Sequence, residues 1–230
     1  MLTPNQSLPL FPLNTVLFPR MTLPLRIFEP RYRQMLADCL KDEPIFGVVL
    51  IKGGEEVGGP ATPREIGTVA RIIGVEKKSE ALLHVTTVGE ERFLLRRILR
   101  DSPYLVGEVE PFPLASVDAP SIEALAEQGT ALLVAYLDLL SRATGAEIKL
   151  QRPPRDPERV AYLIAMTLQG SSSEKQRLLS IPDLPTLFRE EVSLLRNEGK
   201  ILSVMIQALE SQRGKGALDK VGGTFSFSKN

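Results

Sequence analysis

The sequence predicts an α+β protein in which a β unit of about six antiparallel strands and one helix is followed by an α-helical bundle. Up to about residue 112, apolar residues alternate or form short branched runs, and short polar connections separate them. That pattern is typical of antiparallel neighbours. Beyond a linker containing Pro111, Pro113 and Pro120, the apolar residues recur at helical spacing. Because closure removes open strand edges, we expect the six strands to curl into a small barrel.

The first structured segment is Leu8–Cys39, whose closely spaced prolines exclude a helix because each lacks a backbone donor and clashes with the preceding turn. Prolines are also excluded from central strands, so this segment should follow a sheet edge or a bulge. From Thr22 to Phe28 the apolar residues alternate with other residues, which predicts a half-buried strand. Pro30 suits the first position of a helix, which we expect to end near Lys41.

The remaining strands are predicted from short apolar runs. Ile45–Ile51 is continuously apolar and branched, as in a strand covered on both faces. Residues 52–64 are rich in Gly and Pro and have no period, so they form a loop, and they lack the pattern of a phosphate-binding loop. Four more strands are expected, with Gly89-Glu90 as one of the short connections between them, at 65–77, 82–88, 92–99 and 104–112.

The second half of the chain carries helix signals. Ser121 can cap a helix that reaches about Arg142, and Asp156-Pro157 starts another. Ser173 with Gln176 predicts a capping box before a short helix, and the last helix opens at Asp183. Amphipathic helices of this kind bury their apolar sides against one another in a bundle. The resulting division, including a Gly-rich tail expected to be disordered, is 1–113 for the β unit, 114–212 for the bundle and 213–230 for the tail.

Composition restricts the classes of function. The chain has 230 residues and a formal net charge of +0, which argues against a protein built mainly to bind nucleic acid. The one cysteine, Cys39, cannot form an internal disulfide and has the helical neighbours of a buried thiol. No apolar run is long enough to cross a bilayer, and no secretory signal opens the chain, so we expect a cytoplasmic protein without a membrane partner.

Four separated motifs carry a resemblance to a known family. In order along the chain they are LPLFPLNTVLFPRMTLPLRIFEPRYRQML, FGVVLI, IGTVARI and VGEERF. The later segments DPERVAYLIA and EKQRLLSIPDLPTLFREEVSLL continue the match. From about Leu8 to about Leu209 the chain resembles the amino-terminal, substrate-binding domain of Lon proteases. The resemblance implies a PUA-like barrel and recognition of other polypeptides.

The resemblance does not extend to the enzymatic parts of Lon proteases. Those proteins carry an ATPase module and a Ser-Lys peptidase module after this region, and this sequence contains neither a Walker motif nor a candidate peptidase sequence. We therefore expect a free-standing, non-catalytic protein-binding module that needs no cofactor. Its expected partners are unfolded or exposed polypeptide segments and a separate protease or chaperone. No motif in the sequence supports a third interpretation, an uncharacterised hydrolase.

A search for catalytic or metal-binding residues finds no site. His84 is the only histidine, so a metal site of paired imidazoles is excluded, and a hydrogen-bonded histidine within a strand is the simpler interpretation. Gly170 followed by three serines is not the nucleophile motif of hydrolases. Neighbouring carboxylates such as Glu90 and Glu91 are expected to be solvated.

Two clusters are candidate binding sites. The Pro-rich loop from Leu13 to Met21 has more apolar residues than a loop needs, and an exposed apolar patch would mark a protein-binding site at Val16, Leu17, Phe18 and Met21. The alternative is that these residues pack under the barrel or against the bundle. A basic strand offers the alternative function, an RNA-binding PUA-like protein, through Arg92, Arg96, Arg97 and Arg100. Because Glu90, Glu91 and Asp101 flank it, paired surface charges are the simpler interpretation.

Overall fold

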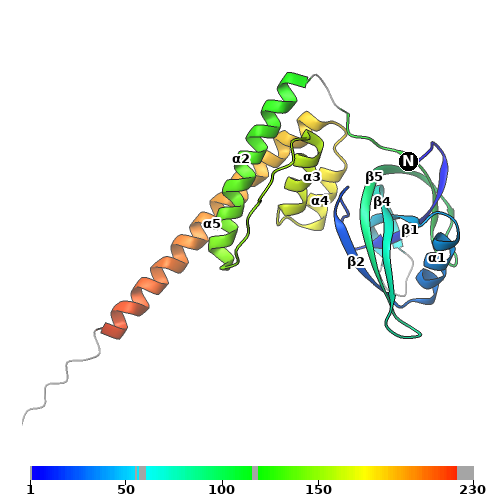
Figure 1. Cartoon of the computed structure of the whole chain (residues 1–230), viewed down its shortest axis with the longest axis horizontal. Coiled ribbons are helices and arrows are strands. Elements are labelled where there is room, and N and C mark those ends of the chain that lie inside the picture. Colours follow the sequence, from blue (N-terminus) through cyan, green and yellow to red (C-terminus); the bar gives the residue numbers. More distant parts are fainter. Residues whose placement is uncertain (1, 55, 57–60, 116–118, 222–230) are drawn as a thin grey trace, which may run out of the picture.

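The computed structural model describes residues 2–54, 56, 61–115 and 119–221. Figure 1 shows the strands and the first helix gathered in one part of the molecule and the other helices in a second part. The expected α+β class and the change from strands to helices after the linker are confirmed. In chain order the elements are β1 (Gln6–Leu13), β2 (Thr22–Ile27), α1 (Pro30–Lys41), β3 (Ile45–Gly54), β4 (Ala61–Lys77), β5 (Leu83–Arg100), β6 (Val106–Pro111), α2 (Ala119–Thr144), α3 (Pro157–Thr167), α4 (Ser172–Leu179) and α5 (Leu184–Val221).

The strands form one six-stranded sheet in the order β2-β5-β4-β3-β1-β6. β6 also pairs with β5. The series of paired strands that runs from β5 through β4, β3, β1 and β6 therefore ends again at β5. One pair departs from the expected antiparallel arrangement, because β1 and β3 run parallel. The chain between them contains β2 and α1, and a crossover of this length is what a parallel pair requires.

β5 is a single long strand, so the connection expected at Gly89-Glu90 is wrong. Gly89 is needed for a close approach, since a Cβ atom there would lie 2.2 Å from the carbonyl oxygen of Phe18. The Gly89 amide donates to the Met21 carbonyl (2.9 Å), and the Arg20 amide donates to the Gly89 carbonyl (2.8 Å). The Pro-rich loop is therefore bonded along the middle of β5.

α1 begins and ends as its sequence predicts. Pro30 lies in the first turn, and the buried side of the helix consists of Tyr32, Met35, Leu36 and Cys39. Burial raises the pKa of the Cys39 thiol to about 11, so at neutral pH it is a protonated, apolar side chain.

The other helices differ from the expected caps and limits in three places. α2 begins at Ala119, so Ser121, the cap expected for this helix, lies inside it. Asp156 caps α3 by accepting from the Arg159 amide at 3.1 Å, as predicted. The capping box of α4 consists of Ser171 and Glu174 rather than Ser173 and Gln176, because α4 begins two residues earlier than expected. α5 has 38 residues and extends to Val221, so the segment 213–221 expected in the tail is helical. Residues 222–230 lie outside the described residues.

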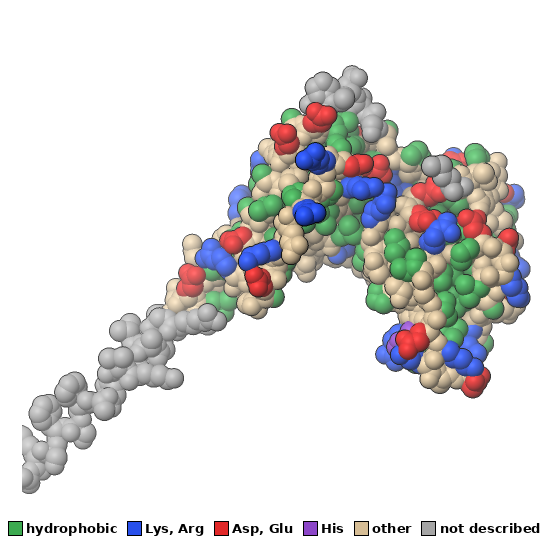
Figure 2. All heavy atoms as spheres, in the orientation of Figure 1, with side chains coloured by type: hydrophobic (Ala, Val, Ile, Leu, Met, Phe, Trp, Pro, Cys, Tyr) green, Lys and Arg blue, Asp and Glu red, His purple; other side chains and the backbone are tan. Residues whose placement is uncertain are grey.

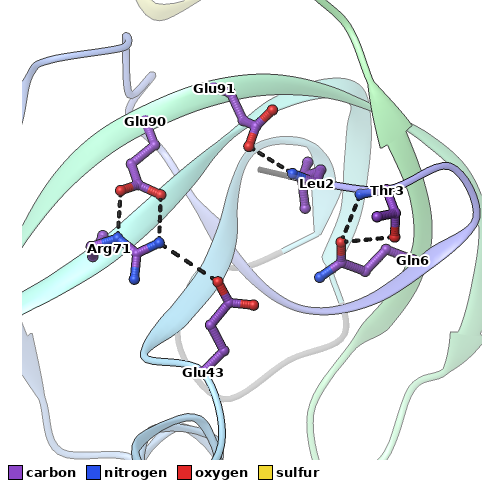
Figure 3. A network of polar contacts seen from close by, with 7 residues as sticks. All are labelled: Leu2, Thr3, Gln6, Glu43, Arg71, Glu90 and Glu91. Carbon is purple, nitrogen blue, oxygen red and sulfur yellow. Dashed lines mark hydrogen bonds and ion pairs between the residues drawn. The ribbon is translucent and has the colours of Figure 1, made fainter.

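Acidic residues of β5 take part in polar contacts instead of remaining solvated. Figure 3 shows Arg71 of β4 between Glu90 and Glu43, with its Nη2 atom 3.0 Å from Glu90 and 3.6 Å from Glu43. Glu91 accepts from the Leu2 amide at 2.7 Å. These contacts hold β4, β5 and the approach to β3 together, so the expectation of solvated carboxylates is wrong here.

The two parts of the molecule share one apolar core. Val16, Phe18 and Leu50 from the β unit lie in the same cluster as the buried side chains of the helices. The Phe18 and Tyr162 rings are 6.5 Å apart between centroids. Polar bonds cross the same boundary, since Ser172 Oγ donates to the Asn14 carbonyl (2.9 Å) and Gln176 Nε2 donates to the Ile66 carbonyl (3.0 Å).

Glu191 of α5 is a fully buried carboxyl group in the helical part. Neither of its oxygens accepts a hydrogen bond from a described residue. Burial raises its pKa well above the usual value of a glutamate. Over a range of pH, the Glu191 carboxyl is therefore protonated in the folded protein and ionised in the unfolded chain.

Glu191→Gln is expected to raise the free energy of unfolding at pH 8 and to change it much less at pH 5. As pH rises above about 4.3, the ordinary pKa of glutamate, the unfolded chain loses a proton that the folded chain keeps, and stability falls. Glutamine does not ionise in either state, so the variant does not lose stability as pH rises in this range. Urea denaturation at both pH values measures the effect, with Glu190→Gln as the control, since Glu190 is exposed and pairs with Arg177. Equal gains at both pH values would contradict this assignment.

Candidate functional site

The apolar residues of the Pro-rich loop lie in the interior. Val16, Leu17 and Phe18 are buried, Phe18 being 1% exposed, and Met21 is half-buried. Thr68 Oγ1 donates to the Leu17 carbonyl at 2.6 Å and helps to hold the loop on the sheet. The expectation of an exposed apolar patch is wrong, because Val16 and Phe18 pack against the helices and Leu17 packs inside the β unit. The packing alternative therefore describes the structure.

The four arginines of β5 do not form a free basic surface. Arg92 is 2% exposed, and its Nη1 atom donates to the carbonyls of Leu179 (2.6 Å) and Ile181 (2.7 Å). Arg96 pairs with Glu110, and Arg97 pairs with Glu108 at 2.8 Å. The Arg100 guanidinium lies 4.9 Å from the centre of the Tyr104 ring. Each cation already has a partner within the chain, which agrees with the paired-charge interpretation.

The one histidine of the chain lies within a strand. His84 is half-buried in β5, opposite Arg26 of β2 and Glu76 of β4. Among residues 2–54, 56, 61–115 and 119–221, no group of three or more His, Cys, Asp and Glu side chains could hold a metal ion. Over the same ranges, no helix combines the length and the apolar character that crossing a bilayer requires.

A groove beside β2 combines apolar walls with an exposed aromatic ring. Its volume is about 350 Å³, and we call it the β2 groove. Its apolar walls come from β1, β2 and α1 and consist of Phe11, Leu13, Leu23, Leu25, Ile27 and Tyr32. Arg26, Glu29 and Glu56 add charges of both signs. Phe28 also lines the groove and is 51% exposed, which is unusual for a ring of that size.

The β2 groove lies beside an open strand edge. β2 is the first strand in the sheet order and pairs with β5 alone among the described strands. In Figure 2, apolar side chains gather on the visible face of the sheet part. An edge strand next to apolar walls can bind an extended polypeptide, because the edge offers backbone groups and the walls accept side chains.

Sequence reasoning missed the β2 groove although it predicted the strand. The alternation from Thr22 to Ile27 predicts one buried face, and the structure confirms it. The available signal was Phe28, which extends the apolar run past the end of the alternation. That β2 ends the sheet depends on pairings that the local sequence does not contain.

Comparisons with solved structures place the fold in one class, the Lon amino-terminal domain. A Lon N-terminal domain protein from Xanthomonas campestris is similar with a TM-score of 0.58 and 29% identity, over 82% of this chain and 98% of that one. The N-terminal domain of the Mycobacterium avium complex Lon protease shares the fold with a TM-score of 0.64 and 19% identity, over 83% of this chain and 98% of that one.

The family follows from the sequence. The family described as "ATP-dependent protease La (LON) substrate-binding domain" matches residues 7–197, so the chain belongs to it. Lon protease of Anaeromyxobacter dehalogenans is 30% identical over 86% of this chain, and Lon protease 2 of Myxococcus xanthus is 29% identical over the same share. The match covers 24% of each relative, so this chain spans about a quarter of their length.

Proposed function

We propose that this chain is a non-catalytic module that binds unfolded or exposed polypeptide segments in the β2 groove. The observation that carries the proposal is the position of an exposed Phe28 ring and an apolar groove next to the open edge of β2. Membership of a substrate-binding domain family supports the same function. An extended segment would add its backbone to β2 and place side chains against the exposed Phe28 ring and the accessible edges of Leu23 and Leu25.

The proposal assigns no ATP hydrolysis or peptide cleavage to this chain. The match with the relatives is restricted to the family's substrate-binding domain, and the sequence has no phosphate-binding loop or Ser-Lys peptidase motif. A separate protease or chaperone is the proposed destination of the bound segment. The cytoplasmic location and the PUA-like description stay predictions. RNA binding is the second candidate function, but the pairing of Arg96 and Arg97 with glutamates weighs against it.

Phe28→Ala is expected to weaken binding of a reduced, carboxymethylated unfolded protein by about 1–3 kcal/mol, as loss of an aromatic anchor does. Fluorescence anisotropy with a labelled substrate measures the affinity. Because apolar contacts carry the binding, it should persist in 0.5 M sodium sulfate, a concentration on the order of those that strengthen apolar burial. Ile73→Ala is the matched control, since Ile73 is 59% exposed and lies outside the β2 groove.

The double variant Arg96→Ala and Arg97→Ala separates polypeptide from RNA. Binding through phosphates releases counterions and weakens steeply with salt, whereas apolar binding does not. We expect this double variant to leave polypeptide binding nearly unchanged. Steep salt dependence together with loss of binding in the arginine variant, while Phe28→Ala has no effect, would replace the proposal with RNA binding.

A further inference from the structure

A second cavity, about 570 Å³ in volume, lies between the first part of β4 and the helix α4. We call it the β4 pocket. Its β side consists of Lys52 and residues 62–66, and its helical side includes Ser173, Gln176 and Arg177. The cavity shares no lining residue with the β2 groove.

The β4 pocket borders an open stretch of strand edge. β4 pairs with β3 from Ala61 onward, but its pairing with β5 begins only at Ile66. Residues 61–65 therefore have a strand partner on one side only, among the described strands. At Ile66 the carbonyl accepts from Gln176 Nε2 at 3.0 Å. The side chain of Gln176 thus binds the backbone of β4 at the residue where pairing with β5 begins, next to the open stretch.

Gln176 also has an unused acceptor. The residue is 6% exposed, and its Oε1 atom accepts no hydrogen bond from a described residue. A buried acceptor without a donor is costly, so a ligand that supplies an N–H group here gains from that state. Backbone amides of an extended polypeptide are donors of this kind.

The charge of the β4 pocket selects among polypeptides. Lys52 and Arg64 are exposed and form no ion pair with another described residue, whereas Arg177 pairs with Glu190 at 2.6 Å. Glu65 is the single carboxylate among the described lining residues, so the lining is net positive. None of the described lining residues is aromatic, so these residues offer no ring on which bases could stack. This chemistry favours an acidic polypeptide over nucleic acid.

We propose that the β4 pocket binds an acidic, extended polypeptide segment as an added strand along residues 62–65. The segment's amides reach the open edge, and one of them reaches Gln176 Oε1 once this buried side-chain amide turns toward the pocket. Its carboxylates face Lys52 and Arg64. This inference rests on the proposed function in that both sites bind polypeptide, but it assigns a separate surface with a different preference. A long substrate could contact the β2 groove through apolar residues and the β4 pocket through acidic ones.

A fluorescein-labelled peptide that alternates glutamate and valine, used with the full chain at low salt, tests the proposal by anisotropy. We expect saturable binding that Arg64→Glu weakens at least about 10-fold, because the variant replaces attraction by repulsion. The matched control is Arg152→Glu, which makes the same charge change at an exposed residue outside the pocket. N-methylation of alternate backbone nitrogens should weaken binding by a similar factor, since it removes the donors that strand addition needs.

Equal losses from Arg64→Glu and Arg152→Glu would overturn the proposal, as they would show attraction to net charge alone. Undiminished binding of the N-methylated peptide would overturn strand addition. Displacement of the peptide by an RNA oligonucleotide whose binding Arg64→Glu abolishes would assign the pocket to nucleic acid instead. Phe28→Ala should not affect the acidic peptide, and Arg64→Glu should not affect the apolar substrate. Failure of either site can therefore be recognised independently of the other.

Discussion

Phe18→Ala is expected to lower the free energy of unfolding by about 3–5 kcal/mol, the range for truncating a buried phenylalanine. Phe18 is 1% exposed and belongs to the core cluster that joins the sheet to the helices. The cavity left behind cannot close easily. The Phe18 carbonyl lies against Gly89, and the loop is bonded to β5 through Arg20 and Met21, so the backbone is held in place. Urea denaturation followed by circular dichroism measures the change.

Phe28→Ala is the matched control for this effect, because Phe28 is half-exposed and its truncation removes little buried surface. We expect it to change the free energy of unfolding by less than about 1 kcal/mol. Substitution of Phe18 should thus affect stability, whereas substitution of Phe28 should affect polypeptide binding. A Phe18→Ala protein with unchanged stability and lost binding would restore the loop as a binding site.

Arg92→Ala is expected to destabilise the protein by about 2–5 kcal/mol, because two buried carbonyls lose their donor. Its Nη1 atom serves the carbonyls of Leu179 and Ile181, and a buried acceptor left without a donor costs about 1–3 kcal/mol. An opposing contribution is the removal of a buried charge, since burial lowers the pKa of Arg92 and its Nε and Nη2 atoms donate no hydrogen bond to a described residue. The lost packing over the Phe112 ring, 4.8 Å from the guanidinium, adds to the cost. We therefore expect net destabilisation.

Arg96→Ala provides the comparison for Arg92, because Arg96 lies on the same strand and its ion pair with Glu110 is exposed. Such pairs contribute about 0–1 kcal/mol. Calorimetry should show one unfolding transition for the native chain, since one core spans both parts, and two transitions or a broadened one for Arg92→Ala. Equal stability losses in both variants would show that the bonds to Leu179 and Ile181 do not hold the parts together.

Features set by local chemistry could be predicted from the sequence. The limits of α1, the alternation of β2 and the Asp156 cap of α3 all depend on residues within a few positions of one another. The parallel pairing of β1 with β3 could not be predicted in this way, because it depends on which strands meet after the crossover. Gly89 shows the same limit, since a glycine that permits close approach looks identical in sequence to a glycine in a turn.

The candidate sites show the same difference between local features, which the sequence predicts, and distant contacts, which it does not. The sequence identified the apolar loop and the arginine strand as unusual, and both are, but their partners lie far away along the chain. Phe18 meets Tyr162, and Arg92 meets Leu179 and Ile181. An apolar or basic cluster therefore indicates a contact surface without saying whether the partner is another molecule or a later part of the same chain. The β2 groove and the β4 pocket depend on strand edges, which only the complete sheet defines.

The shared core also sets an order of events during synthesis. Ser172 bonds to Asn14 across 158 residues of sequence, and Phe18 reaches Tyr162 across a comparable length. At about 5–20 residues per second, a ribosome needs on the order of 10–30 s to make that intervening chain. During this interval the strands can pair, but Val16 and Phe18 have no helices to cover them. A module whose proposed task is to hold exposed apolar segments thus presents such a segment of its own to chaperones until α3 and α5 have been made.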